Sequence, residues 1–88
     1  MQSYYELKVI TPQGNAYSAQ VTHTLVPGED GYLGVLANHA PLVTSSPGGK
    51  FEVQEKDGQK KRFKAGLGFF EVARNQATFL TRTFSAAE

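Results

Sequence analysis

Apolar and polar residues alternate along several short stretches of the chain. Near the N-terminus, Tyr5, Leu7 and Val9 fall on one face of an extended backbone, whereas Glu6 and Lys8 fall on the other. Alternation with a period of two residues is typical of antiparallel strands that bury one face and expose the other. The same alternation recurs over residues 50–55 and 68–73.

The two later stretches follow this pattern, and we expect their inward side chains to be Phe51, Val53, Phe70 and Val72. One further stretch is less regular, because it places Val21 and Leu25 on one face with His23 between them. No stretch repeats apolar residues at helical spacing over three turns. The tail from Ser85 to Glu88 has the residues of a helix N-terminus, but four residues are too few for a helix.

Turn-forming residues separate the strands at intervals of about 8–12 residues, which is typical of a β-sandwich or a β-barrel. Asp57-Gly58 is a favoured two-residue turn and predicts a hairpin between the strands that flank it. Asn75-Gln76 predicts a second hairpin, because asparagine tolerates the left-handed backbone conformation. We therefore predict a single all-β domain over residues 1–88.

The composition excludes several classes of site. The chain has no cysteine, so it has neither disulfides nor thiolate metal ligands, and His23 and His39 are too few for a structural zinc site. The net charge of +1 is interspersed and does not indicate a nucleic acid or an anionic membrane as a partner. No apolar run approaches the roughly 20 residues of a membrane helix. The N-terminus lacks the pattern of a signal peptide.

Three features invite a chemical interpretation, but none has the surroundings that the chemistry needs. The glycine pairs in 31–34 and 66–68 are not followed by a helix that would complete a phosphate loop. His39 has no nucleophile held in an elbow beside it. Glu29 and Asp30 lack the alternating acidic positions of a calcium loop. We expect no catalytic residue, cofactor site or metal site.

The densest positive charge lies between Lys56 and Lys64. One interpretation is a small β-barrel that binds nucleic acid or an acidic protein through this strand. The other is a solvated outer face whose lysines protect a sheet edge. The alternation favours the second interpretation, because it puts Phe63 on the face opposite Arg62 and Lys64, inside the core.

The middle of the chain resembles a known family. The residues Gly31-Tyr32-Leu33-Gly34-Val35, followed by His39-Ala40-Pro41-Leu42, are similar to the G-x-L-G-I-x-x-x-H-A-P-L pattern of the ATP synthase epsilon subunit. Residues 5–12 resemble the opening strand of that family. The stretch 68–80 resembles its G-F-x-E-V-x-x-N-x-V-T-x-L ending. The resemblance covers nearly the whole chain in the same order.

The resemblance implies a flattened antiparallel β-sandwich of about ten short strands. It also implies a non-catalytic subunit in the central stalk of a proton-transporting rotary ATP synthase. Such a subunit couples the gamma subunit to the membrane c-ring and reaches the membrane only through the complex. The implied location is the cytoplasmic face of the bacterial inner membrane or the stromal face of a thylakoid.

The resemblance implies two partner sites, carried over residue by residue. The residues on the c-ring side are Glu29, Asp30, Gly31, Tyr32 and Leu33. The residues on the gamma side are His39, Ala40, Pro41, Leu42 and Thr44. Packing within the sandwich is the equal alternative for Leu33, Pro41 and Leu42.

Three departures from the family pattern change the expectations. The family usually continues into a two-helix inhibitory domain, whereas this chain ends at Glu88, so we expect neither inhibition by a helix nor ATP binding. Tyr32 stands where the family often has an acidic or polar residue, and an aromatic ring there can pack on a partner. Asn38 replaces a glycine, but asparagine adopts the left-handed conformation at small cost, so the turn should persist.

Overall fold

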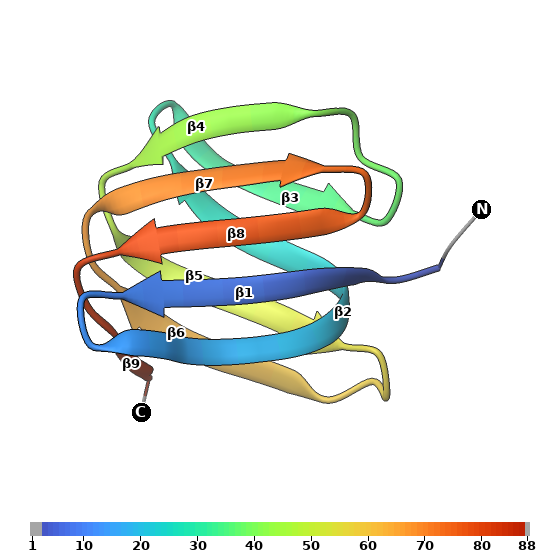
Figure 1. Ribbon diagram of the computed structural model, residues 1–88, viewed down its shortest axis with the longest axis horizontal. Coiled ribbons are helices and arrows are strands. Elements are labelled where there is room, and N and C mark those ends of the chain that lie inside the picture. The colour runs from blue at the N-terminus through green and yellow to red at the C-terminus, as the bar shows by residue number, and fades with distance from the viewer. Residues whose placement is uncertain (1–2, 88) are drawn as a thin grey trace.

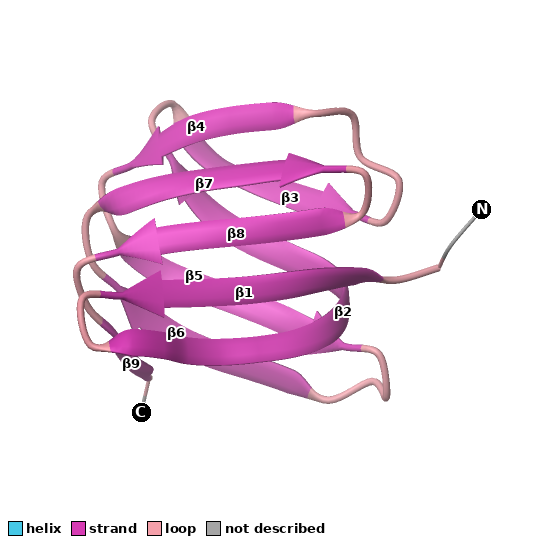
Figure 2. Cartoon of the chain, viewed as in Figure 1, coloured by secondary structure: helices cyan, strands magenta, loops and turns pink. Residues whose placement is uncertain are grey.

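The computed structural model describes residues 3–87, which form strands joined by short turns (Figures 1 and 2). The strands are β1 (Tyr5–Thr11), β2 (Gly14–Gly28), β3 (Gly31–Leu36), β4 (Leu42–Ser46), β5 (Gly49–Glu55), β6 (Lys60–Ala65), β7 (Gly68–Ala73), β8 (Gln76–Thr81) and β9 (Phe84–Ala86). No helix occurs among the described residues, so the predicted all-β class is confirmed.

The strands form two layers that enclose the core (Figure 1). The front layer has the order β4-β7-β8-β1 and ends with the first half of β2. The rear layer consists of β3, the second half of β2, β5, β6 and β9. Neighbouring strands are antiparallel except β1 and β8, which are parallel. The sheet does not close on itself, so of the two predicted architectures the chain forms the sandwich.

Strand β2 passes from the front layer to the rear layer, and a bulge between Val21 and His23 marks the transition. A bulge inserts one residue and reverses the alternation beyond it. As a result Val21 is buried, but the next inward residues are Thr24 and Val26, while Leu25 turns outward. The prediction that Val21 and Leu25 share a face is therefore wrong, because it assumed an unbroken strand.

The core confirms the other alternations. Each side chain expected inside is at most 3% exposed, namely Tyr5, Leu7, Val9, Phe51, Val53, Phe70 and Val72. Tyr5 is the polar exception. Its hydroxyl donates to the carbonyl of Val35 at 2.8 Å and pairs with the Thr24 hydroxyl at 2.5 Å. These bonds join β1, β2 and β3 and satisfy a buried polar group that would otherwise be costly.

Both predicted hairpins are present, each with a slightly different turn. Residues 56–59 connect β5 to β6, and three of them, 56–58, form the turn in place of the predicted two, because the amide of Glu55 still donates to the carbonyl of Gln59. Gly58 has φ of 94°, and its amide donates to the carbonyl of Glu55. This is a turn followed by a bulge, the next most common hairpin connection. Between β7 and β8 the central residues are Arg74 and Asn75, both with positive φ, one position earlier than predicted.

The short strand β9 did not follow from the sequence, which gave the tail only the features of a helix start. Residues 84–86 instead pair with β6. Phe84 fills the side of the sandwich and lies 4.5 Å from the Phe63 ring and 5.3 Å from the Phe51 ring, measured between ring centroids. Glu88, the last residue of that expectation, lies outside the described residues.

Candidate partner-binding surfaces

The turn predicted to face the c-ring connects β2 to β3 at one end of the sandwich, on the left in Figure 1. The turn is attached to the body of the protein on both sides. The Ser45 hydroxyl on β4 donates to the Glu29 carboxylate, and the amide of Lys50 on β5 donates to the Tyr32 hydroxyl at 3.2 Å. Asp30 lies exposed at the apex, whereas Leu33 packs against the core.

The side chain of Tyr32 extends from β3 past β2 to β5. In the register of β2 and β3 it faces Pro27, and its hydroxyl reaches the beginning of β5. A Cβ atom on Gly49 would come within 3.2 Å of this hydroxyl, so the glycine leaves room for the hydroxyl. Tyr32 remains 54% exposed, so part of its surface is accessible to a partner.

The segment predicted to face gamma, residues 39–42, lies at the opposite end of the sandwich, because β3 carries the chain from one end to the other. Asn38 precedes it with φ of 66°, which confirms that asparagine keeps the left-handed turn. The His39 ring donates from Nδ1 to the carbonyl of Ala40 at 2.6 Å. Ala40 and Pro41 are exposed, whereas Leu42 packs against the core.

Thr44 is half-buried on the edge strand β4, and its hydroxyl donates to the carbonyl of Ser45 at 2.9 Å. The neighbouring residue Val43 points the other way and is 70% exposed. Sequence analysis did not single out Val43. On this strand it presents more apolar surface to a partner than Thr44 does.

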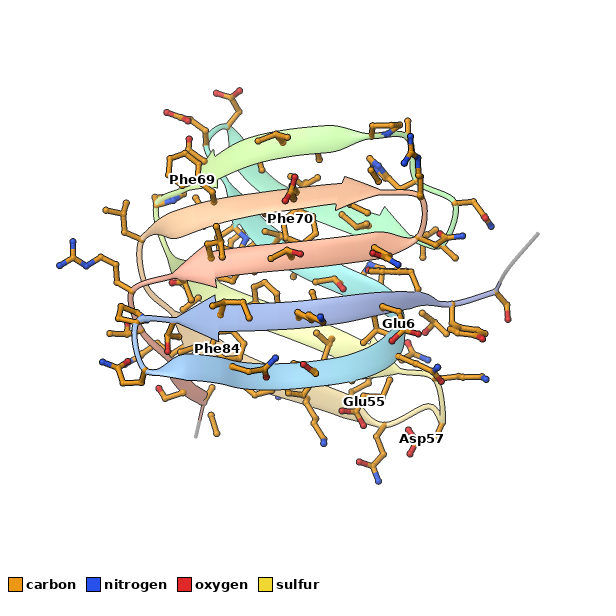
Figure 3. All side chains as sticks on the ribbon, viewed as in Figure 1. Glu6, Glu55, Asp57, Phe69, Phe70 and Phe84 are labelled. Atoms are coloured by element: carbon orange, nitrogen blue, oxygen red, sulfur yellow. The ribbon has the colours of Figure 1, made fainter. Side chains whose placement is uncertain are left out.

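Apolar side chains gather on the outer face of the front layer, toward the end that carries the β2–β3 turn. We call this surface the apolar face; its residues are Ile10, Val43, Leu67, Phe69 and Leu80. Leu80 is the centre of the group, because in the strand register it faces Ile10 on one side and Phe69 on the other. Figure 3 shows Phe69 near the start of β7, with Phe70 beside it between the layers.

The apolar face is unusual for a protein surface. Phe69, Leu67 and Leu80 are each at least 50% exposed and line one open groove. Isolated exposed apolar residues are common, but a contiguous group indicates a contact surface. The sequence contained one signal for it, since Phe69 occupies the otherwise polar side of the alternation in β7.

Two features of the chain hold this surface in shape. Gly68 lies so close to β8 that a Cβ atom would overlap the carbonyl oxygen of Leu80. The Thr81 hydroxyl lies 2.8 Å from the carbonyl of Gly66 and 3.1 Å from that of Leu67. Both contacts fix the backbone of the loop that presents Leu67.

The basic side chains of β6 are exposed, and two of them lie beside carboxylates on β5. Lys61 pairs with Glu55 at 3.0 Å, and Arg62 Nε lies 3.6 Å from the Glu52 carboxylate. The Tyr17 hydroxyl, which donates to Glu55 at 2.5 Å, is the main cause of the lowered pKa of that carboxyl, and Lys61 adds to it. Phe63 turns inward, as predicted, and packs on Phe84 and Tyr17. The arrangement lacks the exposed aromatic platform of a nucleic-acid surface.

Within residues 3–87, no group of three or more acidic or histidine side chains is placed to hold a metal ion. Over the same range, no helix has the length and apolar character needed to cross a bilayer.

The sequence comparisons agree on one family. Residues 4–87 match the family described as "ATP synthase, Delta/Epsilon chain, beta-sandwich domain". An ATP synthase epsilon chain of Chlorobium limicola is 36% identical over 81 residues, which is 92% of this chain and 92% of the relative. Epsilon chains of Pelotomaculum thermopropionicum and Protochlamydia amoebophila are 40% and 36% identical, and this chain spans 60% and 57% of their lengths.

Solved structures share the fold at lower identity. A chain in the Euglena gracilis mitochondrial ATP synthase, in a structure of OSCP, F1 and c-ring, superposes with a TM-score of 0.91 at 20% identity. The alignment covers 98% of this chain and 55% of that one. A chain in the central stalk and c-ring of the Tetrahymena thermophila enzyme gives 0.76 at 13% identity, covering 92% of this chain and 65% of the other.

Proposed function

Because this chain belongs to the ATP synthase delta/epsilon-chain family through its β-sandwich domain, we propose that it is a non-catalytic subunit of the central stalk of a rotary ATP synthase. In this role it joins the gamma subunit to the c-ring and transmits torque without making or breaking a bond. Its place is at the membrane surface, on the cytoplasmic side in a bacterium or the stromal side in a plastid, and the complex holds it there.

The observation that carries the proposal is the apolar face. A subunit that rotates with its partners needs a rigid, partly apolar contact, and Phe69, Leu67 and Leu80 provide one on a two-layer scaffold. We assign this face, together with the edge strand β4 beside it, to the gamma subunit. His39, Ala40, Pro41, Leu42 and Thr44 extend the contact along β4 and the loop that precedes it.

The β2–β3 turn is assigned to the polar loops of the c-ring. Asp30 and Tyr32 are both exposed in this part of the chain, at the end of the sandwich. Glu29, Gly31 and Leu33 shape the turn, since Glu29 is bonded to Ser45 and Leu33 packs inward. A fixed turn suits torque transmission, because little conformational entropy is lost when it docks.

The test is the binding of the gamma subunit of the same enzyme to variants of the full chain. Phe69→Ser removes the largest exposed ring from the apolar face, and loss of an interface anchor of this kind costs about 2 kcal/mol, or about 30-fold in affinity. Leu36→Ser is the matched control, because Leu36 is 60% exposed against 59% for Phe69 but lies on β3, in the rear layer.

Both side chains are exposed, so the unfolding temperatures of the two variants should stay close to that of the parent. Calorimetric titration then separates the effects. Weaker gamma binding by Phe69→Ser alone supports the assignment. Equal binding by both variants, or a larger loss with Leu36→Ser, overturns it. A parent chain that never associates with gamma overturns the proposed function itself.

A further inference from the structure

Two asparagines that are distant in the sequence contact each other at one end of the sandwich. The backbone amide of Asn38 donates to Oδ1 of Asn75 at 2.6 Å, and Nδ2 of Asn75 donates to Oδ1 of Asn38 at 3.0 Å. The two residues are 37 positions apart. We call this reciprocal pair of bonds the asparagine clasp.

Both asparagines occupy left-handed backbone positions, with φ of 66° for Asn38 and 59° for Asn75. Glycine satisfies such a position at least as well as asparagine does. The backbone therefore explains why a residue that tolerates positive φ stands at each site, but it does not explain the amide groups. The amide groups are explained by the clasp, because glycine at either position could not form its side-chain hydrogen bonds.

Asn75 connects three segments. Its carbonyl accepts a hydrogen bond from the amide of Glu6 at the start of β1, at 3.0 Å. Its side chain holds Asn38, and its backbone forms the turn between β7 and β8. The segment that follows Asn38 contains the exposed Ala40 and Pro41, so the clasp ties the gamma-facing loop to the rigid front layer.

We propose that Asn75 is a positioning residue for the loop of residues 37–41 and holds it, through Asn38, in the conformation that binds gamma. The inference rests on the proposed function, since it assumes that this loop faces gamma. Prior ordering of a loop raises affinity, because the entropy of ordering is not lost on binding. Removing the clasp should leave the sandwich folded and the loop free to sample other conformations.

The first test is hydrogen exchange of the residue 38 amide in the full chain. Asn75→Gly keeps the left-handed turn and deletes both bonds of the clasp, so this amide should exchange about tenfold faster, as expected for the loss of one hydrogen bond. Asn38→Gly keeps the backbone donor and the Asn75 acceptor, so its effect should be smaller. Asn15→Ala, at an exposed asparagine bonded to Ser18, is the control and should change nothing at residue 38.

The second test is gamma binding by the same variants at a temperature where all are folded. We expect Asn75→Gly to weaken binding about fivefold to tenfold and Asn38→Gly to do so less. The double variant should match Asn75→Gly alone, because that substitution already removes both bonds of the clasp. Unchanged exchange at residue 38 in Asn75→Gly overturns the clasp.

Faster exchange with unchanged gamma affinity overturns the positioning role while leaving the proposed function intact. A parent chain that does not bind gamma overturns both the positioning role and the proposed function, and the exchange experiment still reports whether the clasp orders the loop. Rapid exchange combined with weaker binding supports the inference.

Discussion

At the scale of residues, a few side chains hold segments that are distant in the sequence. Among the described residues, the non-glycine positions with positive φ are Asn38, Arg74 and Asn75, and each lies at a corner of the sandwich. Tyr5 plays a comparable part inside the core, where its hydroxyl joins three strands. The hydroxyl of Tyr5 and the side-chain amide of Asn75 each join distant segments through hydrogen bonds that the alternation of apolar residues does not predict.

The pH dependence of stability should report the buried hydroxyl of Tyr5. Burial raises the pKa of Tyr5 to about 12, although the hydrogen bond from Thr24 opposes the shift. The unfolded chain ionises near pH 10, so the stabilisation is complete below that pH and is lost as the pH rises from 10 to 12. Each such group lowers the free energy of unfolding by up to about 1.4 kcal/mol per pH unit.

Tyr5→Phe should lower the free energy of unfolding by about 1–3 kcal/mol at pH 7, because the carbonyl of Val35 loses its buried donor. Between pH 10 and 12 the variant should lose stability less steeply than the parent. Burial also raises the pKa of Tyr17, so part of the slope remains in both proteins. Urea titrations across this range measure the two slopes, and parallel curves would show that Tyr5 is not the group responsible.

At the scale of elements, the long strand β2 and the short strand β9 determine how the two layers meet. The bulge in β2 lets one strand serve both layers, so the front and rear sheets share a continuous backbone on one side. Strand β9 covers the core beside β6, where Phe84 packs with four aromatic rings. The two elements therefore complete the sandwich.

Phe84→Ala should lower the free energy of unfolding by about 2–3 kcal/mol, less than for a fully buried phenylalanine, because Phe84 is half-buried. The lost contacts include the two shortest ones, with Phe63 and Phe51, and both rings would become more exposed. Leu36→Ala provides the control, because an exposed leucine outside the core should change stability by about 0.5 kcal/mol or less. Thermal unfolding compares the two variants, and equal stabilities would contradict a structural role for β9.

At the scale of the whole molecule, the candidate partner residues occupy opposite ends of the sandwich. The β2–β3 turn lies at one end and the loop of residues 37–41 at the other, and the longest dimension of the molecule is 32 Å. The apolar face lies nearer the β2–β3 turn. This arrangement is compatible with the proposed contacts. The β2–β3 turn could face the c-ring loops while the apolar face and the loop of residues 37–41 face the gamma subunit.

Crosslinking in the assembled enzyme tests this orientation. The chain has no cysteine, so Asp30→Cys and Ala40→Cys each introduce a unique attachment site for a short photoreactive crosslinker. We expect Asp30→Cys to link to the c-ring, whereas Ala40→Cys should link to gamma and not to the c-ring. The reverse pattern would mean that the sandwich sits the other way up in the stalk.

The sequence alone determined which faces of most strands are buried, where the chain turns, and which family it belongs to. Alternation identified Tyr5, Phe51 and Phe70 as core residues because side chains in a strand point to opposite faces by geometry. Turn residues located both hairpins, although the exact loop depended on hydrogen bonds such as the one from Gly58 to Glu55. All of these features depend on residues close together in the chain.

Only the tertiary structure decided the features that depend on residues far apart in the sequence. The bulge at Val21 reversed the faces of β2, and strand β9 formed because β6 offered it an edge. The apolar face exists because β1, β4, β7 and β8 lie side by side, so single exposed residues such as Phe69 and Leu80 become one surface. The contact between Asn38 and Asn75 likewise needs both corners of the fold in place.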